Sequence, residues 1–124
     1  MEPSIEKNTL IMPYNRGMVL SIVMDTTDID LSEYQVIRAD IKELDSLVAP
    51  PIHSLSLADG ISVTTATVGD VTTHTLVATI SEARTAVMSR PTYYMDIKCR
   101  ISTNSPAIRL ASIKLIKDET ITDI

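Results

Sequence analysis

Apolar and polar residues alternate along most of this chain, and that period of two is the strongest constraint on its fold. Successive side chains of a β-strand point to opposite faces, so the pattern predicts strands with one buried and one solvated face. The alternation is clearest in residues 93–101. The inward side chains predicted there are Tyr93, Met95, Ile97, Cys99 and Ile101.

Three further segments alternate in the same way and are expected to be core strands. Their predicted inward residues are Met18, Leu20, Ile22 and Met24 in the first, Ile37, Ala39 and Ile41 in the second, and His74, Leu76, Ala78 and Ile80 in the third. Weaker strand patterns cover residues 9–12, 52–57, 61–67 and 108–116. The chain therefore contains seven or eight short strands.

Local signals refine this outline. In residues 108–116 the apolar phase reverses, which predicts a β-bulge near Ala111 and Ser112. Asp59-Gly60 and Gly69-Asp70 are hairpin-type turns, because glycine accepts a positive φ.

One helix is expected, in residues 81–88. Ser81 is a good N-cap residue, and Ala83, Ala86 and Val87 would point inward over about two turns.

Many short strands and one short helix indicate an all-β fold, an immunoglobulin-like antiparallel β-sandwich, with a jelly roll as the less favoured choice. The length of 124 residues and a hydrophobic content of 44% suit a single packed domain. We expect an N-terminal arm at residues 1–13, the sandwich at residues 14–117 and a C-terminal tail at residues 118–124.

Composition disfavours several classes of function. A net charge of −5 opposes nucleic-acid binding, which depends on Lys and Arg neutralising phosphates. With no Trp, no Phe and four Tyr, the chain has few aromatic platforms for sugars. No membrane-spanning run or signal peptide is expected. A single cysteine, Cys99, allows no internal disulfide, which suits a reducing cytosol.

Candidate metal ligands are limited to Asp25, Asp28 and Asp30, whose spacing does not match a calcium-binding loop. Aspartates also occur in turns because they bond nearby amides, and that interpretation is favoured. No metal or cofactor is expected.

Candidate catalytic residues are equally few. His53 and His74 lack a Cys, Asp or Glu at zinc-site or nucleophile-base spacing, and Cys99 is predicted to be a buried, inert thiol. No catalytic motif is present, so we expect a protein that is not an enzyme.

The open edges of a sandwich favour protein partners instead, because they must be blocked or used for pairing. Apolar residues near both chain ends could dock on a neighbouring subunit, although terminal disorder explains them equally well. These candidate partner-binding residues are Ile5, Leu10, Ile11, Ile121 and Ile124.

Four segments follow one another along this chain: Arg16-Gly17 before the first long strand, the loop at residues 30–34, the helix at 81–88 and the strand at 93–97. The order of these segments resembles that of phage virion β-sandwich domains. The lactococcal phage upper baseplate protein carries an example as its N-terminal domain. The resemblance covers roughly residues 14–117.

That resemblance implies an adaptor or decoration module of a bacteriophage particle, in a capsid decoration, head-fibre anchor, neck or baseplate. It implies virion proteins as partners, a homo-oligomer or symmetric array, and synthesis in the bacterial cytoplasm. A soluble carbohydrate- or protein-binding sandwich is the alternative, followed by a hydrolase on the same scaffold.

Overall fold

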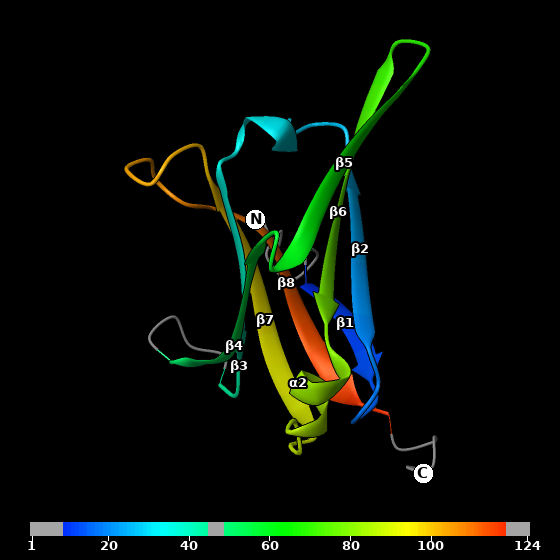
Figure 1. Ribbon diagram of the computed structural model, residues 1–124, viewed down its shortest axis with the longest axis vertical. Helices are drawn as coiled ribbons and strands as arrows, with labels where there is room; N and C mark the ends of the chain where they lie inside the picture. The colour runs from blue at the N-terminus through cyan, green and yellow to red at the C-terminus, as the bar shows by residue number, and fades with distance from the viewer. Residues whose placement is uncertain (1–8, 45–48, 119–124) are drawn as a thin grey trace, which may run out of the picture.

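The computed structural model describes residues 9–44 and 49–118, and most of them lie in β-strands (Figure 1). No helix in these ranges is long and apolar enough to span a membrane. The elements in chain order are β1 (Thr9–Tyr14), β2 (Leu20–Thr26), η1 (Leu31–Glu33), β3 (Val36–Lys42), β4 (Pro51–Leu57), β5 (Gly60–Val68), β6 (Val71–Ile80), α2 (Glu82–Ala86), β7 (Thr92–Arg100) and β8 (Ile108–Lys117).

The strands follow the order β1-β8-β7-β3-β4-β5-β6-β2, and the ladder nearly breaks between β4 and β5. Those two strands share only the pairs Ser56–Gly60 and Leu57–Ile61. The fold is therefore two layers, with β1, β8, β7, β3 and β4 in one and β5, β6 and β2 in the other. The immunoglobulin-like arrangement places β2, β6 and β5 in one sheet opposite β8, β7, β3 and β4 in the other. This arrangement confirms the predicted fold class.

Two strand pairings differ from the antiparallel expectation, and one of them moves the domain boundary. β1 runs parallel to β8, with Leu10 opposite Ile113 and Ile11 opposite Lys114. The sandwich therefore begins at Thr9, inside the predicted arm at residues 1–13. The short β4–β5 contact is parallel as well.

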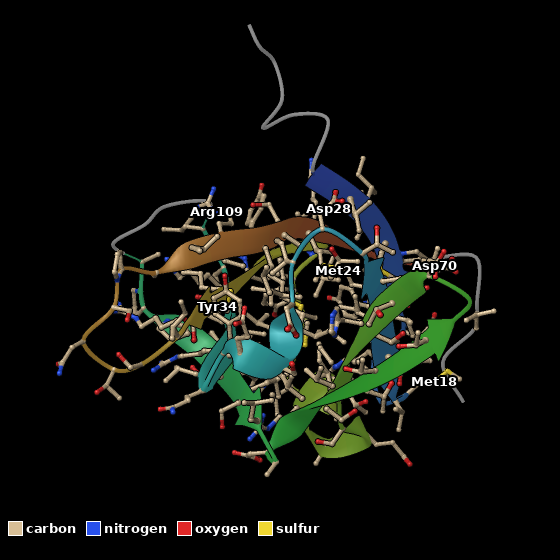
Figure 2. All side chains as sticks on the ribbon, turned by 90° about the horizontal axis from the view of Figure 1, so that it is seen from above. Met18, Met24, Asp28, Tyr34, Asp70 and Arg109 are labelled. Carbon is tan, nitrogen blue, oxygen red and sulfur yellow. The ribbon has the colours of Figure 1, made fainter. Side chains whose placement is uncertain are left out.

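The core lies between the two layers, where Figure 2 shows side chains filling the space below β8 and above β5 and β6. The inward faces predicted for β3 and β6 are buried throughout. In β7 the predicted inward residues Tyr93, Met95, Ile97 and Cys99 are buried, but Ile101 is 53% exposed. Met18 is equally exposed, because both residues lie beyond the ends of their strands.

The predicted bulge is present in β8, one residue before its expected place. Ile97 pairs with Ala111, whereas the next β7 residue, Lys98, pairs with Arg109. Leu110 is thus the extra residue, and after it Ala111 and Ile113 are buried. The bulge reverses the facing of β8, as the change of apolar phase indicated.

Helix α2 begins at its predicted cap but turns a different face inward. The Arg84 amide donates to Ser81 Oγ over 3.3 Å. Thr85 and Met88 are fully buried, while Val87 is 65% exposed. The helix has only five residues, and Thr85 Oγ1 donates to the Met18 carbonyl over 2.7 Å, which fixes that side of the helix against the sandwich.

Two buried tyrosines close the corner between α2 and β7. Tyr14 Oη donates to the Met88 carbonyl over 3.2 Å and also to the Arg90 carbonyl. The Arg90 amide in turn donates to Tyr93 Oη over 3.2 Å. The two rings meet edge to face with centroids 5.8 Å apart, and burial followed by the nearby Tyr93 raises the pKa of Tyr14 to about 12.

The two predicted hairpin turns have different outcomes. Gly69-Asp70 joins β5 to β6 in a two-residue hairpin, as predicted. Asp59-Gly60 instead carries the chain from one layer to the other, since β4 and β5 are parallel where they touch. Gly60 has φ +99°, and a methyl group on it would lie 2.7 Å from Leu55 Cδ2.

Replacing Gly60 should therefore destabilise the domain more than replacing Gly17. Gly17 has φ +81°, and no atom lies within 4 Å of an added Cβ. Gly17→Ala should therefore lower the free energy of unfolding by only about 1 kcal/mol, the cost of a left-handed backbone conformation for alanine. Gly60→Ala adds a collision with Leu55 that costs a further ~1–3 kcal/mol. Urea denaturation of both variants measures the difference, and equal losses would show that Leu55 yields without cost.

Candidate protein-binding site

The outer edge of β1 carries two of the predicted partner-binding residues. Leu10 is 46% exposed and Ile11 is 67% exposed. β1 is the last strand of its layer, so within residues 9–44 and 49–118 it has a strand neighbour only on its β8 side. Its segment, residues 9–14, contains no charged residue to protect that edge, and Pro13 removes one backbone donor. Ile5, Ile121 and Ile124 lie outside the described residues.

A second exposed apolar group lies where the β1–β2 loop meets α2. Arg16 Nε donates to the Ala86 carbonyl over 2.7 Å, and the Thr85 hydroxyl bonds the Met18 carbonyl. Met18 and Val87, on the two bonded segments, both point to solvent. The sequence pattern placed these side chains in the core, so this surface was missed.

The outer face of the five-stranded layer carries a basic row of Arg38, Lys98 and Arg109. In the strand register Arg38 is opposite Lys98, and Lys98 is opposite Arg109. Like charges directly across strands repel each other. Two carboxylates in the next row offset part of that repulsion. Arg38 Nε lies 2.8 Å from Asp40 Oδ1, and Arg109 Nε lies 3.8 Å from Asp96 Oδ1.

Next to this row is a shallow cavity of about 280 Å³. Its walls include Arg38, Lys98 and Arg100. Burial raises the pKa of the Asp40 carboxyl, but hydrogen bonds from Arg38 and Ser54 more than offset that effect, and the pKa is lowered. Asp40 therefore stays ionised and holds Arg38 in place.

A buried histidine, His74, joins a polar cluster between strands and a loop. It is 6% exposed, its Nδ1 lies 2.9 Å from Thr65 Oγ1, and its Nε2 lies 3.4 Å from Asp30 Oδ1. Asp30 also caps η1, since it accepts from the Ser32 amide over 3.1 Å and from the Ser32 hydroxyl. The cluster joins β5, β6 and η1.

Sequence reasoning missed the partner of His74 because it searched only short spacings. Asp30 lies far away in the chain, and no local pattern indicates the contact. A hydroxyl, an imidazole and a carboxylate in contact are also the groups of a nucleophilic relay. Any catalytic activity of the wild-type protein that is lost in Thr65→Ala would therefore contradict the prediction that the protein is not an enzyme.

Asp25 and His53 have structural partners. Thr75 Oγ1 donates to Asp25 Oδ1 over 2.7 Å, and His53 Nε2 lies 3.0 Å from the Arg84 carbonyl. Cys99 is buried, and burial raises the pKa of its thiol. Within the described part of the chain, no three His, Cys, Asp or Glu side chains are grouped to hold a metal ion.

Comparison with known proteins gives little beyond this geometry. No protein-family profile matches the chain, and no curated protein matches it. One similar solved structure comes from a study of the multimeric cell-adhesive interactions of VGSC beta subunits, with 11% identity and a TM-score of 0.37. It covers 90% of this chain and 93% of that one.

Asp30 should contribute to stability only while it is ionised. Hydrogen bonds from Ser32 are the largest cause of its lowered pKa, and the nearby His74 adds to them. A lowered folded pKa gives stability that is complete above the unfolded value, near 4, and is lost as the pH falls through the folded pKa.

Asp30→Asn keeps the N-cap but loses this charge, so the difference in Tm between wild type and variant should shrink below about pH 4. Thermal melts from pH 7 to pH 2 measure it. Asp28→Asn, in the same loop, controls for the loss of one negative charge. A difference that stays constant down to pH 2 would contradict the assigned role of the Asp30 charge.

Proposed function

We propose that this chain is a protein-binding module, without catalytic activity, that assembles into a symmetric array in a bacteriophage particle. The observation that carries the proposal is the open β1 edge, with exposed apolar side chains at Leu10 and Ile11. The module docks through this edge on a virion protein. It acts as a decoration or adaptor in a capsid, neck, head fibre or baseplate.

The physics of the edge supports a protein partner. Burying apolar surface contributes roughly 25 cal/mol per Å², so covering Leu10 and Ile11 favours association by a small amount for each copy. In a symmetric array many such contacts act together, because later contacts become intramolecular. An individually weak edge is therefore sufficient for an array.

The phage assignment is supported by the four segments of the resemblance, three of which have the following places in the fold. Arg16-Gly17 forms the turn before β2, where Gly17 has φ +81°. Residues 30–34 contain the capped η1, and residues 93–97 form the buried centre of β7. These segments are structural, so the resemblance carries over no catalytic residue.

Ile11→Glu should abolish incorporation into particles while leaving the fold intact, because it places a charge at the docking edge but keeps the β8 ladder. Deleting residues 1–12 would instead remove most of β1 and is not a clean test. Mass spectrometry and electron microscopy of purified particles measure incorporation. Circular dichroism and Tm verify folding.

Val23→Glu is the matched control, since Val23 is 60% exposed on the other layer. The docking edge is wrongly assigned if Ile11→Glu enters particles as well as Val23→Glu does. If the wild-type chain gives no density in any particle, the phage role itself is wrong.

A further inference from the structure

β5 has a free edge that is distinct from the β1 edge. It pairs with β6 from Ile61 to Val68, but with β4 only at Gly60 and Ile61. The segment Ser62–Val68 therefore has one side without a strand partner in the described part of the chain. Figure 1 shows the β5–β6 hairpin projecting well beyond the rest of the sandwich.

The backbone phase of this segment follows from two observations. The Ile61 carbonyl accepts from the Ala58 amide over 3.1 Å, on the side away from β6. Because the direction of backbone groups alternates, Val63, Thr65 and Thr67 also direct their N–H and C=O groups to the free edge.

Side-chain contacts agree with this phase. Thr65 contacts His74 over 2.9 Å, and Thr67 Oγ1 lies 3.0 Å from Thr72 Oγ1. Such close side-chain contacts are typical of the narrow, non-hydrogen-bonded pairs of an antiparallel ladder. The free edge thus offers three sets of backbone donors and acceptors.

This edge lacks the usual protection. The segment GISVTTATV has no charged residue and no proline, although natural edges are commonly guarded by Lys, Pro or bulges. Val68 is 80% exposed at its end. A long, uncharged, β-branched edge of this kind is a template for another strand.

We propose that Ser62–Val68 is a self-association site, at which a second copy adds its own Ser62–Val68 in antiparallel orientation. The free segment is centred on Thr65, so a two-fold axis there places Thr65 of one copy opposite Thr65 of the other. In the same register Thr64 lies opposite Ala66, and Val63 lies opposite Thr67. The result is a continuous six-stranded sheet, β2-β6-β5 joined to β5-β6-β2.

The chemistry of the segment favours a second copy as the occupant. Each chain carries a net charge of −5, yet this edge brings no like charges into register. A two-fold pairing joins equal lengths and satisfies the same donors and acceptors on both copies. Val63 borders a cavity of about 210 Å³, whose walls include Leu31, Tyr34 and Leu57. In the proposed register Thr67 of the second copy lies opposite Val63, next to this cavity.

The dimer should be weak. A contact along seven residues of one edge buries less than the roughly 1,200 Å² of standard stable interfaces. The contact is therefore concentration dependent in solution and gains strength where the copies are already held in an array.

Disulfide trapping tests the register. With the two-fold axis at Thr65, a mixture of Thr64→Cys and Ala66→Cys proteins should form a mixed disulfide dimer under mild oxidation. Either variant alone should form far less, because its cysteines are displaced along the edge. Cys99 is buried and does not compete. Equal dimer yields from all three samples would overturn the proposed register.

Sedimentation velocity up to about 1 mM tests the association itself. Thr67→Pro removes a donor at the free edge and the hydroxyl contact with Thr72, but no β6 ladder bond, so it should abolish dimerisation and lower Tm less than Ala66→Pro does. Ala66→Pro, one residue earlier, removes a ladder donor and should lower Tm. A wild-type chain that is monomeric throughout, or a Thr67→Pro variant that dimerises normally, would overturn the proposal.

Ile11→Glu separates this contact from the β1 docking edge. It should leave sedimentation unchanged, because β1 lies at the end of the other layer. Loss of the dimer in Ile11→Glu with retention in Thr67→Pro would assign self-association to β1 and overturn the β5 contact.

Discussion

The crossing at Gly60 is the constraint on which the rest of the architecture depends. The backbone passes so close to Leu55 that a side chain has no room, and it requires a positive φ. Because the chain leaves the β4 ladder after two pairs, β5 belongs to the opposite layer. The tight crossing, in which Ala58 also has a positive φ, thus accompanies the change of layer and leaves Ser62–Val68 without a strand partner on one side in the described part of the chain.

The core does without the disulfide that often joins the two sheets of immunoglobulin-like domains. Cys99 is the only cysteine and is free. Burial of aliphatic faces from both layers provides the main stabilisation. The paired Tyr14 and Tyr93 add directional bonds at the corner after α2, where they bond the Met88 carbonyl and the Arg90 amide.

The period of two predicted strand facing well, because facing is a local property once a strand exists. His74 and Ile97 were placed inward correctly on that basis. Strand ends, in contrast, depend on where a partner strand stops, so Met18 and Ile101 were misassigned. Long-range contacts such as Asp30 with His74 leave no local pattern at all. The exposed residues Leu10 and Ile11 lie in a segment with only a weak strand pattern in its sequence, and its parallel pairing with β8 was not predicted, because pairing depends on a distant strand.

The β1 and β5 edges differ in the chemistry by which they can recognise a partner. β1 offers exposed aliphatic side chains, and its backbone is interrupted by Pro13, so complementary apolar surface must supply its affinity. β5 offers an uninterrupted row of backbone groups with small hydroxyl side chains, so hydrogen bonding to another strand must supply its affinity. Since they end different layers of the sandwich, one copy can use both edges at once. A module with two such edges can link neighbours to each other and to a scaffold, which is the requirement for a symmetric array.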